Sequence, residues 1–193
     1  MNSLSKPLSI SAVDAAKRLL GSYLIRSLEG VEVVCRIVET EAYDQTDPAS
    51  HSYRGMTPRT AVMFGPAGYS YVYFTYGMYY CLNVVVGPEN QAAAVLIRAV
   101  EPLSGVELIK TNRPKIVDNY MLANGPGKLC LALAVDKQLS GHDLTKEPLR
   151  LELKQPVASE DIVTTERIGI SKATELKWRF YIKDNPYISR YKR

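Results

Sequence analysis

A tyrosine-rich segment, Tyr69–Tyr80, constrains the fold of this chain more than any other feature. It holds six of the thirteen tyrosines. Aromatic and β-branched residues favour strands, and two such runs, Tyr71–Thr75 and Tyr79–Val86, flank the triplet Tyr76-Gly77-Met78. Because glycine tolerates the positive φ of a tight turn, we expect a β-hairpin that carries an aromatic side chain at its tip.

The tyrosines of this hairpin have two physical uses. A tyrosine ring can stack on a nucleobase while its hydroxyl stays hydrated, which would make the hairpin a nucleic-acid contact. The same rings also suit an ordinary strand pair packed into a core. A net charge of +4 and an isoelectric point near 8.9 suit a polyanionic partner without requiring one.

The rest of the chain predicts one α+β domain over residues 1–193. With 46% hydrophobic residues, the chain can bury a core of normal size. The strands come in adjacent pairs, with helices inserted between and after the pairs, which favours a curved, mostly antiparallel sheet with flanking helices over a doubly wound parallel sheet. We expect helices at 11–21, 102–111 and 125–133, further strands at 23–28, 31–43, 92–100, 149–154 and 178–183, and a long irregular loop at 44–68.

Three cysteines, Cys35, Cys81 and Cys130, lie far apart in apolar runs. An odd number without a CxxC pair argues against a disulfide framework or a zinc site, and for a reducing cytosol. No stretch of 18 consecutive apolar residues occurs, so we expect no membrane association. Histidines and acids show no metal-ligand spacing, so we expect no metal and no cofactor.

The strand Arg36–Tyr43 carries two carboxylates among apolar residues. Alternation places Glu39, Glu41 and Tyr43 on the same face as Ile37. A buried carboxylate is costly unless it is paired or hydrogen-bonded, so a buried pair would indicate a use. The alternative is that both glutamates lie on a solvated strand end, as most glutamates do.

Three polar residues elsewhere are candidates for the same site. Arg98 stands in an apolar strand and needs a carboxylate partner, for which Glu41 or Glu39 is the natural choice. His51, in a polar loop, could stack on a base, donate a hydrogen bond or carry a proton, or be an ordinary surface histidine. Asn83 could read a base edge or bond to neighbouring backbone.

The segment Gly125-Pro126-Gly127-Lys128 only partly resembles a phosphate-binding loop. Such a loop needs a glycine at position 122 and Ser or Thr after the lysine, whereas leucines occupy both positions. What remains is a helix start with a lysine, which could hold a backbone phosphate or be a plain structural cap.

Taken in order, these motifs are similar to those of the alkyladenine (3-methyladenine) DNA glycosylase family. The matching motifs are RIVETEAY at 36–43, HS at 51–52, TPR at 57–59, YVYFTYGMY at 71–79, Asn83, LIRAVEP at 96–102, GPGKLC at 125–130 and RFY at 179–181. The resemblance covers nearly the whole chain. It implies a single mixed domain with a protruding hairpin that excises alkylated or deaminated purines from DNA.

The resemblance also implies roles for individual residues. Glu41 would be the general base that activates a water, and Arg98 would help to position that water. Tyr43 and Tyr73 would stack on the flipped purine. His51 would complete the pocket, and Asn83 would crowd the exocyclic amino group of guanine.

Further residues match the DNA-contacting positions of the family. Tyr76 would intercalate where the flipped base has left the stack, and Lys128 would face a phosphate. Met56 stands where the mammalian pattern has a basic residue. The resemblance implies damaged double-stranded DNA as partner and a monomer without cofactor or metal. The remaining DNA-contacting positions are Thr57, Arg59, Met63, Met78 and Tyr79.

Two other functions use the same residues. A non-catalytic nucleic-acid binding module would use the tyrosines but not the carboxylate of Glu41. A hydrolase of free nucleosides would use the carboxylate but not the hairpin tip at Tyr76. Because no lysine lies on the expected pocket strands, we expect water as the nucleophile and no Schiff-base lyase step.

Overall fold

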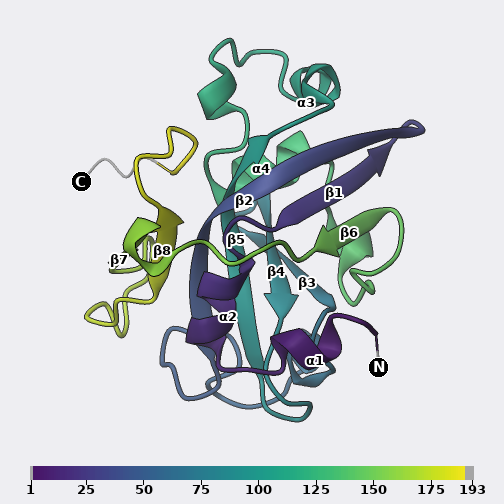
Figure 1. The fold of residues 1–193 in the computed structure, drawn as a ribbon. Coiled ribbons are helices and arrows are strands. Elements are labelled where there is room, and N and C mark those ends of the chain that lie inside the picture. Colours follow the sequence, from purple (N-terminus) through teal and green to yellow (C-terminus); the bar gives the residue numbers. More distant parts are fainter. Residues whose placement is uncertain (1, 190–193) are drawn as a thin grey trace.

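A computed structural model describes residues 2–189 and confirms the expected α+β fold with a curved antiparallel sheet (Figure 1). Eight strands form one sheet, in the order β3-β4-β5-β2-β1-β6, while β8 pairs with β2 and β7 with β8. Every pairing is antiparallel. The strands are β1 (Tyr23–Leu28), β2 (Val31–Asp44), β3 (Ser70–Thr75), β4 (Tyr79–Val85), β5 (Ala93–Pro102), β6 (Leu149–Glu152), β7 (Ile162–Thr165) and β8 (Arg179–Ile182).

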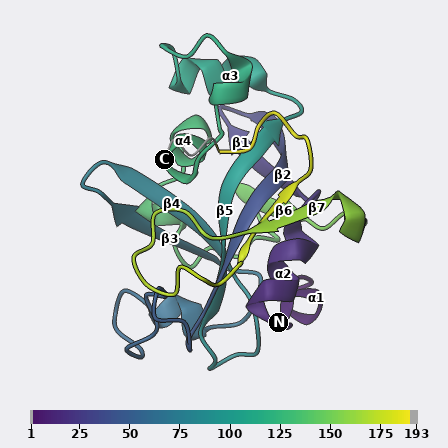
Figure 2. The same cartoon turned by 90° about the vertical axis from the view of Figure 1, so that its left-hand side faces the viewer.

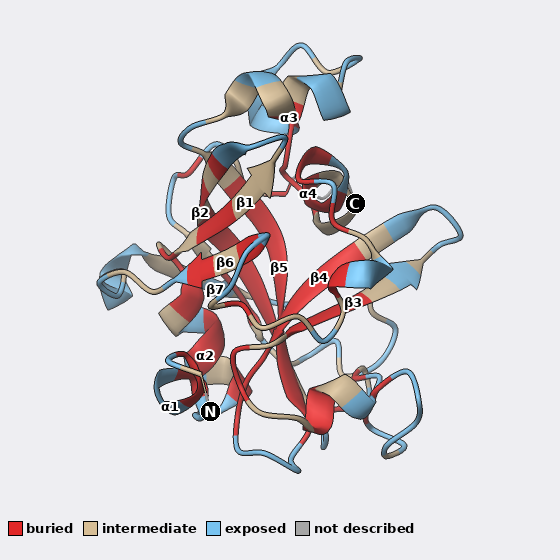
Figure 3. Cartoon of the chain, turned by 90° about the vertical axis from the view of Figure 1, so that its right-hand side faces the viewer, coloured by how far each residue is buried: buried red, intermediate tan, exposed pale blue. Residues whose placement is uncertain are grey.

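Helices cover the curved sheet on both sides. The helix α2 (Ala12–Leu19) begins at the expected cap, where Ser11 accepts a hydrogen bond from the Asp14 N–H, and its buried alanines and leucine pack against the sheet. The other helices are α1 (Ser5–Leu8), α3 (Val106–Asn112) and α4 (Pro126–Ala132), with four short 3-10 turns at 61–64, 119–121, 137–139 and 159–161. The strands β4 and β5 are buried along most of their length (Figure 3).

The tyrosine-rich hairpin extends away from the body of the protein (Figure 2). The turn residues Tyr76 and Gly77 have φ values of 52° and 67°, so the expected glycine stands where the backbone is left-handed. The tip is exposed while the other ends of β3 and β4 are buried in the sheet. The hairpin is therefore anchored at its base and free at its tip.

Several boundaries differ from the sequence-based expectation. The helix α3 begins at Val106 and not at Pro102, because β5 continues through Pro102 and a turn with Gly105 at φ 72° precedes the helix. The short elements α1 and β7 were not predicted. Each has four residues, which is too short for a clear periodic pattern.

Two β-bulges interrupt the pairing of β2 with β5 close to the carboxylates. Ile37 pairs with Val100 and Glu39 with Ala99, so β2 has one extra residue between these two pairs. Between the Glu39 pair and the pair that follows it, the extra residue belongs to β5 and is Arg98. Bulges often occur beside active sites because they re-aim side chains. Here the bulged Arg98 reaches both Glu39 and Glu41.

Candidate active site

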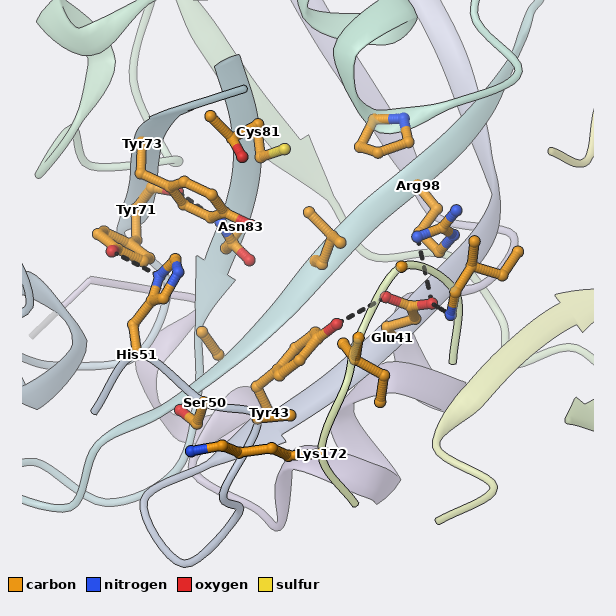
Figure 4. Close-up of a pocket in the computed structure, with 18 of the residues that line it drawn as sticks. Glu41, Tyr43, Ser50, His51, Tyr71, Tyr73, Cys81, Asn83, Arg98 and Lys172 are labelled. Carbon is orange, nitrogen blue, oxygen red and sulfur yellow. Dashed lines mark hydrogen bonds and ion pairs between the residues drawn. The ribbon is translucent and has the colours of Figure 1, made fainter. Parts of the chain in front are cut away.

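A cavity of about 340 Å³ opens between the hairpin and the long strands β2 and β5 (Figure 4). Its size lies within the ordinary range of small-ligand pockets, roughly 300–1,000 Å³. Strands β2, β3, β4 and β5 supply its walls, together with the loop segments 48–51 and 168–172. All of these segments belong to one chain.

Glu41 lies at one end of this cavity with its side chain fully buried. Its Oε1 accepts the Ile168 backbone N–H at 2.8 Å and lies 3.2 Å from Nη1 of Arg98. Its Oε2 accepts the Tyr43 hydroxyl at 2.8 Å. These contacts fix the carboxylate in one orientation, and Oε2 keeps acceptor capacity beyond the tyrosine bond.

Arg98 connects Glu41 to a second buried carboxylate. Its Nε lies 2.9 Å from Oε1 of Glu39, which also accepts from Arg179 at 2.6 Å and from the Ser189 hydroxyl at 2.6 Å. Burial disfavours the charge of Glu39, but Arg98, Arg179 and Ser189 together hold its pKa below the usual value. Burial also disfavours the charge of Arg98, yet Glu41 and Glu39 raise its pKa. The expected pairing of Arg98 is confirmed with both acids, and the solvated strand end is excluded.

Tyr43 forms one wall of the cavity, and its phenol points at Glu41 (Figure 4). Burial and the adjacent carboxylate raise the pKa of Tyr43 above its ordinary value, so the hydroxyl stays protonated and donates. The hydrogen bond orients the ring as well as the carboxylate.

A cluster of three rings forms the facing wall. His51 lies edge-on to Tyr73, with centroids 4.5 Å apart and an interplanar angle of 82°, and its Nδ1 lies 3.1 Å from the Tyr71 hydroxyl. Tyr71 and Tyr73 are tilted by 33° at 5.5 Å. His51 keeps an exposed side, but partial desolvation against these rings and the charge of Arg59 lower its pKa, so the neutral imidazole is favoured at pH 7.

Asn83 lines the same cavity from β4 and is buried. Its side-chain amide donates to the Tyr71 backbone carbonyl at 2.9 Å. The backbone partner considered for this amide is therefore present, and it fixes the carboxamide with one end toward the pocket. Whether Asn83 reads a base edge stays a prediction.

The hairpin tip meets the mouth of the cavity. Tyr76 is 77% exposed, lines the mouth, and has its hydroxyl close to Gly169 of the opposite loop. Met78 and Tyr79 are also exposed, and the ring of Tyr79 packs so closely on Gly127 that a Cβ at this glycine would lie 2.8 Å from it. Their role in DNA binding stays a prediction.

The remaining predicted DNA contacts lie in different surroundings. Thr57 is exposed and bonds to Thr60 at the start of the 3-10 turn 61–64, and the guanidinium of exposed Arg59 lies 5.3 Å from the Tyr73 centroid. Met63 is buried and lines the cavity from within. Lys128 donates to the Asn124 side chain at 2.7 Å, and burial with nearby Arg113 lowers its pKa. Their roles in DNA binding stay predictions.

The loop after β7 contributes functional positions that sequence reasoning did not identify. Ile168 binds Glu41 through its backbone, and Lys172 lines the cavity. Arg167, directly before this loop, is buried behind Tyr43. An arginine before the apolar run Ile168-Gly169-Ile170 was the available signal, but nothing in the sequence linked it to Glu41.

Residues 2–189 contain neither a metal-binding group of side chains nor a membrane-spanning helix. No group of three or more His, Cys, Asp or Glu side chains in this part of the chain is arranged to hold a metal ion. Within the same residues, no helix is both long and apolar enough to span a bilayer.

Known proteins of similar sequence match almost the whole chain. A relative from Carboxydothermus hydrogenoformans is 53% identical over 176 residues, which cover 91% of this chain and 92% of that protein. Relatives from Francisella tularensis and Desulfitobacterium hafniense are 45% identical over 195 residues (98% and 100% coverage) and 48% identical over 186 residues (90% and 91% coverage). All three carry the name "Putative 3-methyladenine DNA glycosylase".

A model of the Methylpurine-DNA glycosylase (MPG) family matches residues 7–186, which include every strand, every helix after α1 and all residues of the cavity. The chain therefore belongs to the methylpurine-DNA glycosylase family.

Proposed function

We propose that this protein excises alkylated or deaminated purines from double-stranded DNA by hydrolysing the N-glycosidic bond with a water activated by Glu41. The observation that carries the proposal is the placement of the Glu41 carboxylate at the end of a slot walled by Tyr43 on one side and Tyr73 with His51 on the other. In this proposal a flat aromatic base lies between these walls. The sugar carbon of that base would then face the carboxylate.

The target base must leave the duplex to enter this slot. Flipping a nucleotide costs a few kcal/mol, and less for a damaged or mispaired base. Stacking of a base on an aromatic side chain is worth about 1–3 kcal/mol, so Tyr43 and Tyr73 together can offset this cost. The exposed ring of Tyr76, at the tip of the hairpin, can fill the gap left in the duplex.

The chemistry needs a carboxylate that acts as base and stabilises positive charge on the sugar, and a group that orients the water. As the bond between C1′ and the purine nitrogen breaks, the sugar becomes oxocarbenium-like, and a nearby carboxylate stabilises that charge. The water oxygen attacks C1′, its proton passes to Glu41, and the purine leaves with the bonding electrons. Arg98 is held by Glu39 and faces Glu41, so it can orient the water without moving.

The slot favours purines that are electron-poor or cationic. Alkylated purines with a formal positive charge stack well on electron-rich phenol rings. A neutral His51 adds no opposing charge next to such a base. Asn83 is fixed by its bond to the Tyr71 carbonyl and could reject the exocyclic amino group of guanine by steric conflict.

DNA binding is proposed for the surface around the mouth. Arg59 and Lys128 supply positive charge for backbone phosphates, and Thr57, Met78 and Tyr79 lie at exposed positions near the hairpin or the loop before β3. Met63 would act from inside the pocket wall. We propose that the protein acts as a monomer, which is supported by a cavity lined by residues of one chain.

The direct test incubates the protein with duplexes that carry one hypoxanthine or ethenoadenine, and then cleaves abasic sites with alkali. A single break at the lesion position is expected from wild type. A duplex without a lesion is the control. Intact DNA after alkali would contradict the proposal.

A second test asks whether the nucleophile is water or a lysine amine. Lys172 lines the cavity, so its amine is the group that would trap a sugar aldehyde if the enzyme were also a lyase. We propose a monofunctional enzyme that uses water. Treatment with borohydride during the reaction should therefore give no covalent protein–DNA adduct, whereas an adduct lost in Lys172→Ala would show a lyase step.

The two alternative functions are separated by single variants. A non-catalytic binding module would lose nothing in Glu41→Gln, whereas the enzyme would lose base release and keep lesion binding. A free-nucleoside hydrolase would be indifferent to Tyr76→Ala, because it has no duplex gap to fill. The exposure of Tyr76 at the mouth favours a duplex substrate over a free nucleoside.

A further inference from the structure

Arg167 is a fully buried arginine directly behind the proposed base slot. Its side chain has no exposed surface, and neither has that of its partner Asp47. The guanidinium lies 4.6 Å from the Tyr43 ring centroid and 5.3 Å from that of Trp178. Because Tyr43 lines the cavity and Arg167 does not, the guanidinium lies on the side of the tyrosine ring away from the pocket.

The contacts of Arg167 join three separate segments. Its Nη1 and Nη2 form a bidentate pair with the Asp47 carboxylate, with the Nη2 bond at 3.0 Å, and Nη1 also donates to the Ala42 carbonyl at 3.0 Å. Its Nη2 lies 3.5 Å from the Ala173 carbonyl. One side chain therefore binds the end of β2, the loop before His51 and the loop after β7.

These three segments are the ones that build the slot. The end of β2 carries Tyr43, the loop after Asp47 carries His51, and the loop after Arg167 supplies the Ile168 N–H that holds Glu41. A planar, bidentate guanidinium fixes the relative position of such segments better than a flexible ammonium can.

Burial of this ion pair costs desolvation free energy that a purely structural contact would not need. A buried ion pair is often no more stabilising than apolar residues of similar volume. In addition, the Nε of Arg167 is buried without a hydrogen-bond partner among the described residues. The buried charge of Arg167 is explained more simply by a need to fix the positions of the segments it contacts than by a gain in stability.

We propose that Arg167 is a positioning residue for base excision, which holds the Tyr43 ring and the Glu41-binding loop in register through Asp47 and the Ala42 carbonyl. This inference rests on the proposed function. It predicts that a change at Arg167 slows base release more than it weakens DNA binding, because displacement of a reacting group by about 1 Å can reduce a rate by roughly 10²-fold.

The experiment compares Arg167→Lys with wild type. Lysine keeps the charge beside Asp47 and so favours folding, but it cannot make the bidentate pair, reach the Ala42 carbonyl and lie flat on Tyr43 at once. Arg167→Gln paired with Asp47→Asn provides a second variant without a buried charge. The matched control is Arg26→Gln, because Arg26 also donates to backbone carbonyls, those of Leu133 and Pro148, but lies outside the cavity.

Three quantities are measured on each protein. They are the single-turnover rate of ethenoadenine release, the affinity for a duplex with an abasic site, and the ethenoadenine fluorescence change on binding, which reports stacking of the purine in the slot. We expect a release rate lower by about 10²-fold and a reduced fluorescence change in Arg167→Lys, an unaltered abasic-site affinity, and wild-type values for the control.

Two results would overturn the inference. One is an Arg167→Lys variant that releases base at the wild-type rate. The other is a loss of rate accompanied by an equal loss of abasic-site affinity that the Arg26→Gln control shares, which would indicate general destabilisation. Failure of the proposed function is a distinct result, since wild type would then release no base, and the fluorescence comparison would still test Arg167.

Discussion

The hairpin tip and the floor of the cavity differ in their exposure to solvent. Tyr76 at the tip is 77% exposed on a left-handed turn, and Met78 beside it is 62% exposed, so both are free to meet a partner. The floor of the cavity is formed by Glu41 and Arg98, and Glu39 is joined to Arg98 outside the cavity lining. Both glutamates have no exposed surface and are held by arginines. In the proposed function, the tip would bind DNA with side chains whose exposure costs the fold little, whereas the reaction would depend on buried charges that the fold must compensate.

This difference makes variants of the two regions behave differently. A change at the tip should alter DNA affinity and leave stability unchanged. A change at the floor should alter the chemical step, the stability, or both. Four predictions test this division, in order of decreasing effect.

Glu41→Gln should reduce the rate of base release by about 10²–10⁴-fold, because the carboxamide cannot accept the proton of the water. The glutamine can still accept the Ile168 N–H and bond with the Tyr43 hydroxyl, so the fold should persist. Single-turnover release and binding to a lesion duplex are measured together. A variant with wild-type release would show that another group activates the water.

Arg98→Met should lower the free energy of unfolding by about 3–5 kcal/mol, because Glu39 and Glu41 would then lack their shared counter-charge in a buried site. Urea unfolding at neutral pH measures the change. Arg36→Met is a suitable control, since Arg36 pairs with Glu101 at a partly exposed position and should lose far less. Equal losses of unfolding free energy in both variants would show that the buried ion pairs of Arg98 matter no more for stability than the partly exposed pair of Arg36.

Tyr76→Ala should weaken binding to a lesion duplex by about 5- to 150-fold, the equivalent of one lost stacking contact of about 1–3 kcal/mol. Thermal unfolding should not change, because the side chain is exposed. Equilibrium titration with lesion and undamaged duplexes gives the effect. Unaltered affinity would argue against insertion of this ring into DNA.

His51→Gln should remove an acidic limb from the pH dependence of binding to cationic purines. The pKa of His51 is lowered by burial and by Arg59, so the ring stays neutral until the pH falls below its ordinary value of about 6.5. A lowered histidine pKa also means that folding disfavours the proton, so the stability contributed by neutral His51 decreases as the pH falls. Affinity for a 7-methylguanine duplex between pH 5 and 8 tests this, and an identical limb in both proteins would contradict it.

The sequence was informative about local elements and about burial. The hairpin, the strand pair β1–β2 and the helix α2 were predictable because strand runs, a Glu29-Gly30 turn and a serine cap are local signals. Alternation with apolar residues raised the possibility that Glu39 and Glu41 are buried but left a solvated strand end open, and only the structure shows that both are buried. The roles of these residues came from the family resemblance and not from spacing.

The contributions of the loop 168–172 could not be predicted, for a physical reason. Ile168 binds Glu41 across 127 positions of sequence, and the contact uses a backbone N–H that any residue possesses. Arg167 reaches Asp47 across 120 positions. A pattern in one sequence reports periodicity and turn chemistry, but it does not report which distant loop closes a pocket.

The most direct test of the central claim is a crystal structure of Glu41→Gln bound to a duplex that contains ethenoadenine. The account predicts the purine stacked between Tyr43 and the His51–Tyr73 wall, with C1′ facing residue 41 and Tyr76 in the vacated gap. A purine that remains in the duplex, or a sugar turned away from residue 41, would contradict it.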